Sequence, residues 1–125
     1  MNPDRIIIGG SDAQFLNLLS EKIKFAFPGK QVYTTNEAFD AWHYIQDQKP
    51  GAAVLEMIFS QWDWNGFLLF KFLKKDARFK EMKSVLITDT LNEDAQKMAK
   101  DEDINKVLYK VYNIDFIFEE IKKII

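Results

Sequence analysis

The sequence predicts an α/β protein built on a doubly wound, five-stranded parallel sheet with helices on both faces. Strand-like and helical patterns alternate five times along its 125 residues, without a repeat or a linker, which is typical of this class. Near-unbroken apolar runs also suit strands that helices cover on both faces. These runs are Ile6 to Ile8, Ala52 to Leu55 and Val85 to Ile87. We therefore expect a single domain over residues 1–125, long enough to bury a core.

Apolar residues recur at helical spacing after the first strand and predict the first helix. They are Phe15, Leu16, Leu18, Leu19, Ile23, Ala26 and Phe27. Ser11 or Asp12 can cap this helix, and Pro28 with Gly29 ends it. A short β-branched and aromatic run then predicts the second strand from Gln31 to Thr34.

The second helix is predicted to begin after a cap at Asn36. Its inner face would then carry Ala38, Phe39, Trp42 and Ile45. A break at Lys49 to Gly51 leads into the third strand, which is expected from Ala52 to Glu56. Gly66 precedes the third helix, which is expected from Phe67 to Lys75.

The last part of the chain repeats the same alternation. The fourth strand centres on Val85 to Thr88, and Asn92 is expected to cap a helix that continues to about Lys100. The fifth strand is expected from Val107 to Tyr109, and it leads to a last helix from Asn113 to Ile124. Five strands and five helices result.

Composition narrows the classes of function. A formal net charge of -2 does not indicate a nucleic-acid-binding surface. The lack of cysteine excludes disulfides, thiolate metal sites and cysteine nucleophiles. No apolar run approaches the roughly 18 residues that a membrane span requires, and the first five residues lead straight into a strand. We expect a cytoplasmic protein that binds neither membranes nor nucleic acid.

Polar residues follow four of the predicted strands at the point where each strand ends. They are Gly10, Ser11 and Asp12 after the first, Glu56 after the third, Thr88 to Thr90 at the fourth, and Lys110 after the fifth. The carboxyl ends of parallel strands meet at one edge of the sheet, where open α/β folds place their ligands. These side chains are therefore the candidate site residues.

The order of elements and the strand-end residues resemble the receiver domain of two-component response regulators, across essentially the whole chain. Two predicted helix starts, Asp12 to Leu19 and Gly66 to Leu69, also look like those of the family. The resemblance implies a flavodoxin-like sheet in the strand order 2-1-3-4-5. Between Glu56 and Gly66 the chain carries about two residues more than is usual in the family.

The resemblance also assigns positions to the family's functional residues. In receiver domains two acids hold Mg²⁺, an aspartate takes the phosphoryl group, a Thr or Ser reports it, and a Lys followed by Pro completes the site. The matching positions here are Gly10 and Ser11, Glu56, Asp89 with Thr88 or Thr90 as alternatives, and Lys110 followed by Val111.

The residues at these positions differ from those of the family, and the differences predict that Mg²⁺ binding is lost or weak and that no cofactor is bound. Mg²⁺ offsets the charge of a transferring phosphoryl group only when several hard oxygen ligands hold it. Gly10 has no side chain, Ser11 offers a neutral hydroxyl, and Asp12 is expected to cap a helix instead. An anion at Asp89 would also repel a phosphoryl group.

Glu56 reaches one methylene further than an aspartate, so a direct ion pair with Lys110 is expected. A partly buried pair of this kind can persist without a metal, because each charge offsets the desolvation of the other. Two interpretations stay open. Glu56 either stands in for the phosphorylated state or forms an ion pair without a signalling role.

The leading hypothesis is a degenerate receiver domain, which is a non-enzymatic module that binds a protein partner without phosphorylation. The partner would be a sensor kinase, an output domain or another receiver, and a homodimer is also open. One alternative is a working phosphoacceptor in a phosphorelay, with Asp12 as a metal ligand. The other is a flavodoxin-type module that binds a small molecule or nucleotide at Gly9 to Ser11, where backbone N–H groups can hold a phosphate.

Aromatic residues crowd the lengthened connection after the third strand. Phe59, Trp62 and Trp64 lie in it, and the next helix carries Leu68 and Phe72 where the family usually has polar side chains. Aromatic residues outside a core often mark contact surfaces. Two interpretations are open, since the connection either forms such a surface or folds its tryptophans over Leu68 and Phe72.

Overall fold

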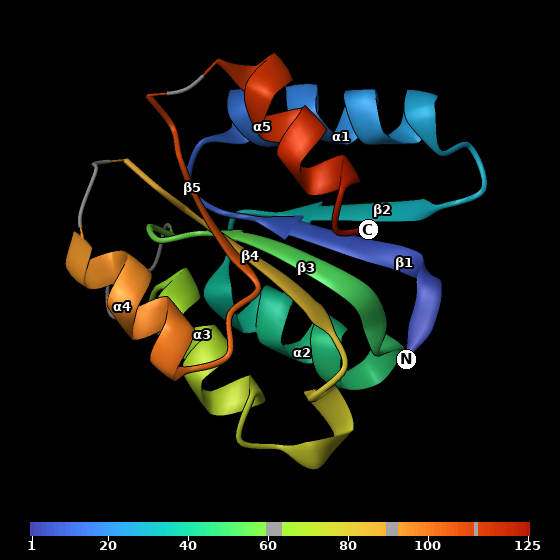
Figure 1. Cartoon of the computed structure of the whole chain (residues 1–125). Helices are drawn as coiled ribbons and strands as arrows, with labels where there is room; N and C mark the ends of the chain where they lie inside the picture. Colours follow the sequence, from blue (N-terminus) through green and yellow to red (C-terminus); the bar gives the residue numbers. More distant parts are fainter. Residues whose placement is uncertain (60–63, 90–92, 112) are drawn as a thin grey trace.

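The computed structural model describes residues 1–59, 64–89, 93–111 and 113–125. Its centre is one parallel sheet in the order β2-β1-β3-β4-β5 (Figure 1). The strands are β1 (Asn2–Gly9), β2 (Gln31–Thr35), β3 (Pro50–Glu56), β4 (Lys83–Thr88) and β5 (Lys106–Tyr109). The predicted doubly wound α/β fold and its strand order are confirmed.

Helices cover both faces of the sheet. Figure 1 shows α1 and α5 together on one face and α2, α3 and α4 on the other. The helices are α1 (Ala13–Ala26), α2 (Ala38–Gln48), α3 (Gly66–Leu73), α4 (Glu93–Asp101) and α5 (Ile114–Lys122), with a short 3-10 helix η1 (Ala77–Phe79) before β4. The three-layer arrangement follows from right-handed crossovers between parallel strands.

Strand alternation divides the core into two apolar clusters. Ile7, Leu55 and Leu86 point into the cluster under α2, α3 and α4, whereas Ile8 and Ile87 point into the one under α1 and α5. These strand residues are almost completely buried. The face that a strand residue occupies therefore also decides where the polar side chain at the strand end projects.

The start of α2 differs from the prediction. Glu37, and not Asn36, occupies the N-cap position, and the Glu37 side chain makes no capping hydrogen bond. The hydroxyl of Thr35 accepts a hydrogen bond from the Glu37 N–H at 3.2 Å and so closes this turn. Phe39 was expected on the inner face but is 57% exposed, because Ala41 instead faces the sheet with Ala38 and Ile45.

Several element ends also differ. β1 begins at Asn2 and β3 at Pro50, because the Asn2 N–H donates to the Lys49 carbonyl at 2.8 Å and extends the pairing to the predicted break. α3 and α5 end earlier than expected, at Leu73 and Lys122. On α1, Leu18 is 46% exposed and Ala26 is exposed, although their spacing placed them with the buried residues. The predicted Asn92 cap lies outside the described residues.

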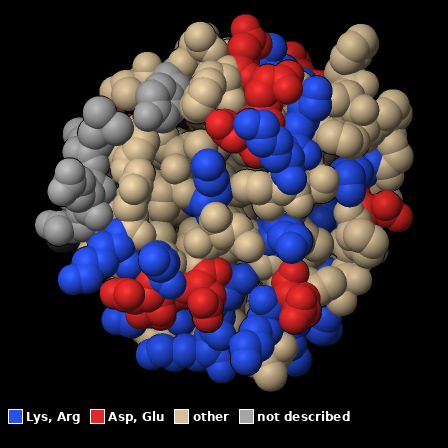
Figure 2. Space-filling view, in the orientation of Figure 1, with Lys and Arg blue, Asp and Glu red and all other residues tan. Residues whose placement is uncertain are grey.

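Charges of both signs are mixed on the surface. Figure 2 shows Lys and Arg side chains gathering along the lower part of this face, with acidic side chains among them. Within the described ranges, no helix combines the length and the apolar character that a membrane span needs.

Candidate functional site

Glu56 and Lys110 form an ion pair at the carboxyl edge of the sheet. Glu56 Oε2 lies 2.6 Å from Lys110 Nζ, and only 3% of Glu56 is exposed. Glu56 ends β3 on the same face as Val54, and Lys110 directly follows β5. The direct contact expected from the length of the glutamate side chain is therefore present.

Asp12 joins this pair from the start of α1. Its Oδ2 lies 3.0 Å from Lys110 Nζ, while its Oδ1 accepts the Phe15 N–H at 3.1 Å and caps the helix. Asp12 thus has the capping role that its position predicted. Its backbone N–H also donates to Glu56 Oε1 at 3.2 Å, so Lys110 contacts the carboxylates of two residues that this backbone hydrogen bond joins.

Phe15 covers the ammonium group. Lys110 Nζ lies 5.0 Å from the centre of the Phe15 ring, within the range of a cation–π interaction. The spacing of apolar residues predicted Phe15 only as a core residue of α1. The available signal was its spacing from Asp12, because residues three apart share one face of a helix.

Gly10 leaves the space that Glu56 fills. A Cβ atom built on Gly10 would collide with Oε1 and Cγ of Glu56, and it would lie 2.5 Å from Glu56 Cβ. No side chain fits at position 10 without displacing Glu56. The resemblance to receiver domains places one of the metal-binding acids at this position, so Glu56 occupies the room such an acid would need.

The backbone donors around Gly10 are already used. The Gly10 N–H donates to the Thr35 carbonyl at 3.1 Å, and the Ser11 N–H donates to the Ile58 carbonyl at 2.9 Å. With the Asp12 N–H directed at Glu56, three successive N–H groups have protein partners. A phosphate bound here would have to compete with these bonds, which weakens the nucleotide-binding alternative.

The electrostatics of the site follow from burial and pairing. Burial raises the pKa of Glu56, although hydrogen bonds from Lys110 and from the Asp12 backbone oppose this effect. Burial alone would lower the pKa of Lys110, but its bonds to Glu56 and Asp12 outweigh it and raise that pKa. The hydrogen bond from Phe15, followed by the one from Lys110, lowers the pKa of Asp12. Lys110 is therefore a firmly held cation at neutral pH.

The fourth strand brings two of its three candidates to this edge. Thr88 is buried and lies on the face opposite Glu56, because its neighbour Ile87 pairs with Glu56. The Thr88 side chain therefore points to the other face, and the choice among Thr88, Asp89 and Thr90 for the hydroxyl position stays a prediction. Asp89 follows it and is exposed, and Thr90 lies outside the described residues.

The donor set does not suit a divalent cation. In the described part of the chain, no three His, Cys, Asp or Glu side chains converge on a point that could hold a metal ion. Ser11 is exposed, Gly10 has no donor, and both nearby carboxylates contact the Lys110 ammonium. Mg²⁺ prefers near-octahedral oxygen ligands, so an ammonium in this position opposes its binding.

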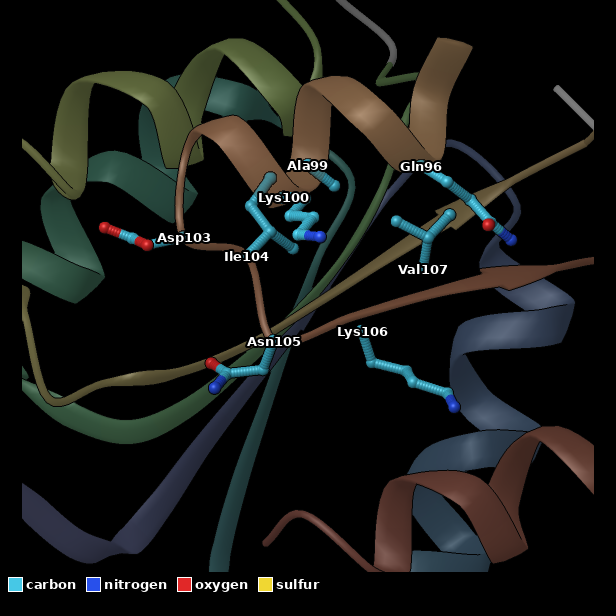
Figure 3. Close-up of a pocket in the computed structure, with 8 residues that line it drawn as sticks. All are labelled: Gln96, Ala99, Lys100, Asp103, Ile104, Asn105, Lys106 and Val107. Atoms are coloured by element: carbon cyan, nitrogen blue, oxygen red, sulfur yellow. The ribbon is translucent and has the colours of Figure 1, made fainter. Parts of the chain in front are cut away.

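A hollow lies between α4 and β5, away from these residues. It has a volume of about 490 Å³ and is lined by Gln96, Ala99, Lys100, Asp103, Ile104, Asn105, Lys106 and Val107 (Figure 3). The labelled side chains come from the end of α4, the turn after it and the start of β5. Polar groups line it, but the Glu56 site contributes nothing to it.

The aromatic residues after β3 separate into two groups. Phe59 is 2% exposed and belongs to the core, so it does not contribute to a contact surface. Trp64 lies between Phe39 and Phe72, and both of these phenylalanines are partly exposed. Trp62 lies outside the described residues. The sequence pattern did not indicate Phe39 for this surface, because its spacing predicted the inner face of α2.

Solved structures of receiver domains share this fold. The receiver domain of a DNA-binding response regulator from Colwellia psychrerythraea 34H superposes with a TM-score of 0.85 at 19% identity, and 95% of each chain is covered. A CheY-like receiver domain protein from Methanospirillum hungatei JF-1 gives a TM-score of 0.80 at 19% identity, covering 98% of this chain and 93% of that one. The Mn²⁺-bound form of the response regulator Rcp1 gives 0.81 at 17%, covering 97% and 91%.

At these identities the comparisons establish the receiver-domain fold. No family model matches the sequence, and no curated protein matches it either.

Proposed function

We propose that this chain is a degenerate receiver domain, which is a non-enzymatic signalling module that binds a protein partner without being phosphorylated. The observation that carries the proposal is the Glu56–Lys110 contact of 2.6 Å above a glycine that leaves no room for an acid. A phosphoryl group approaching Glu56 would meet a carboxylate already neutralised by Lys110. The receiver-like fold supports a place in two-component signalling, with a sensor kinase, an output domain or another receiver as partner.

Loss of the metal site is part of this proposal. Phosphoryl transfer to a carboxylate depends on a cation that offsets the charge on the phosphoryl oxygens. Here the ammonium of Lys110 lies against both Glu56 and Asp12 and supplies the only compensating charge that the described side chains bring to them. We therefore expect neither Mg²⁺ nor another cofactor to be bound.

Incubation with acetyl phosphate and Mg²⁺, followed by intact-protein mass measurement, tests the proposal. We expect no stable mass gain under conditions that phosphorylate an ordinary receiver domain in a parallel tube. A gain of one phosphoryl group, localised to Glu56, would instead support the phosphoacceptor alternative. In that case Asp12→Ala should abolish Mg²⁺ binding and the mass gain that depends on it, because Asp12 is the remaining candidate for a metal ligand.

A further inference from the structure

Three aromatic rings contact one another on α2, on α3 and at Trp64, which lies two positions before α3. Trp64 is central, with its ring centre 6.1 Å from that of Phe39 and 5.8 Å from that of Phe72. Phe39 is 57% exposed and Phe72 is 44% exposed. We call Phe39, Trp64 and Phe72 the aromatic surface. Burying exposed rings of this size is a main source of binding energy at protein interfaces.

A small apolar cavity opens beside the central ring. It has a volume of about 80 Å³ and is lined by Ala38, Phe39, Trp42, Trp64 and Leu69. Its volume exceeds the roughly 10–15 Å³ that a cavity needs to hold one water molecule, but its lining offers water few polar partners. Such a cavity accommodates an aliphatic side chain better than it accommodates water.

Two lysines border the aromatic surface. Lys75 Nζ lies 5.9 Å from the centre of the Phe72 ring, and Lys71 precedes Phe72 on α3. Neither lysine forms an ion pair with any residue that the structure describes. The guanidinium of Arg78, by contrast, is paired with Asp76 at 2.7 Å. An acidic side chain also lies on this side of α2, since Asp40 follows Phe39 and its carboxylate accepts the Tyr33 hydroxyl at 2.6 Å.

We propose that the aromatic surface binds an acidic peptide segment that inserts one leucine-like side chain into the cavity lined by Trp42 and Trp64. The rings supply the apolar contact area, and the carboxylates of the segment face Lys71 and Lys75. Electrostatic complementarity of this kind selects the partner more than it adds affinity. The inference rests on the proposed function as a protein-binding module and names the surface and the chemistry of its partner.

Titration of the ¹⁵N-labelled chain with the peptide acetyl-Glu-Asp-Leu-Leu-Asp-Glu-amide tests this proposal. We expect saturable shifts of the Trp64 indole N–H, which a Trp64→Phe variant identifies. Phe72→Ala should weaken binding at least about tenfold, which corresponds to roughly 1.4 kcal/mol. Phe25→Ala is the matched control, because Phe25 is 89% exposed on α1, in the layer across the sheet, and its loss should leave binding unchanged.

Two further peptides separate the contribution of the leucine side chains from that of the acidic charges. Replacing both leucines by alanine, or the four acids by lysine, should abolish binding, and Lys75→Glu should weaken binding of the acidic peptide. The proposal is wrong if the protein shows no saturable shift, if the basic peptide binds equally well, or if Phe72→Ala binds like the parent chain. A concentration-dependent dimer that Phe72→Ala dissociates would also overturn it, since a second copy would then cover the surface.

The two proposals fail separately. The same protein sample is treated with acetyl phosphate and Mg²⁺, and its intact mass is measured. A protein that gains a phosphoryl group and still binds the acidic peptide contradicts the proposed function but keeps this surface. A protein that gains no phosphoryl group and does not bind the acidic peptide supports the proposed function but contradicts this surface.

Discussion

Glu56 Oε2 and Lys110 Nζ lie 2.6 Å apart, between the ends of two strands that are not adjacent in the sheet. Strand β4 separates them, so the contact crosses the carboxyl edge over the end of that strand. The pair therefore connects the ends of β3 and β5 through a side-chain contact that does not involve β4. Its contribution to the free energy of unfolding shows how far it stabilises the fold.

Removing Lys110 should destabilise the protein more than removing the charge of Glu56. In Lys110→Met a nearly buried carboxylate loses its ammonium partner, and breaking a buried pair from one side costs about 3–5 kcal/mol. In Glu56→Gln the remaining ammonium keeps Asp12 and is 20% exposed, so the cost should be clearly smaller. Urea unfolding at pH 7 measures both free energies of unfolding.

The double variant completes this comparison. Glu56→Gln combined with Lys110→Met should be less destabilised than the sum of the single variants, because the unpaired charge is gone. Strict additivity would mean that the two side chains do not interact energetically.

Gly10→Ala should lower the free energy of unfolding by about 1–3 kcal/mol, the usual cost of forcing an extra methyl group into a packed place. The added Cβ would lie 2.5 Å from Glu56 Cβ, so moving the glutamate head group alone cannot relieve the clash. Gly29→Ala is the control, since a Cβ there meets nothing within 4 Å. Equal stability of the two variants would show that the space at Gly10 is not restricted.

The pH dependence of stability should reflect opposite shifts at two carboxylates. Because the pKa of Glu56 is raised in the folded protein, the folded state takes up a proton at a pH where the unfolded chain does not yet bind one. Stability should therefore rise, relative to Glu56→Gln, as the pH falls toward the ordinary pKa of 4.5. Thermal melting of both proteins between pH 7 and the acid range measures this difference.

Asp12 should act in the opposite direction at lower pH. Its pKa is lowered, so its contribution is present above its ordinary value of 3.8 and is lost as the pH falls through its folded pKa. Comparison with Asp12→Asn isolates this contribution. A flat difference below pH 3.8 would contradict the capping and pairing described for this carboxylate.

Asp12→Ala should cost more than Asn113→Ala, although both residues cap a helix. Asp12 accepts the Phe15 N–H at 3.1 Å and Asn113 accepts the Phe116 N–H at 2.8 Å, and losing such a cap costs about 0.5–2 kcal/mol. Asp12 also contacts Lys110, but its side chain is 45% exposed, so this addition should be small. Urea unfolding of both variants in low salt and in concentrated salt measures the additional loss of stability that comes from the contact with Lys110.

The excess cost of Asp12→Ala should shrink as salt screens the contact with Lys110. An excess that salt does not change would assign the difference to the cap itself rather than to the ion pair.

The fold was predictable because buried parallel strands leave a direct signature in the sequence. Val85 to Ile87 and the other apolar runs marked the strands, and the expected sheet order followed from the resemblance to receiver domains. The cap of α2 was not predictable from residue preference alone. Asn36 is a better intrinsic cap than Glu37, yet Glu37 holds the N-cap position and donates its backbone N–H to the hydroxyl of Thr35.

The Glu56–Lys110 pair of the candidate site was predictable, and the packing around it was less so. Convergence of strand ends placed Glu56 near Lys110, because that depends only on backbone topology. The overlap between Glu56 and the Cβ position of Gly10 depends on how one side chain turns, which no sequence pattern specifies. For the same reason the position of Phe15 over Lys110 appeared only in three dimensions.

The connection between β3 and α3 is closed at its base. The Gly66 N–H donates to the Met57 carbonyl at 3.1 Å, and Ile58 pairs with Asn65 in an antiparallel bridge. Gly66 also packs against the backbone of Glu56, where a Cβ would not fit. These contacts fix the two ends of the connection, so residues added or deleted between Ile58 and Asn65 need not disturb the end of β3. Such a position is suited to carrying a grafted epitope or reporter while the sheet edge keeps its geometry.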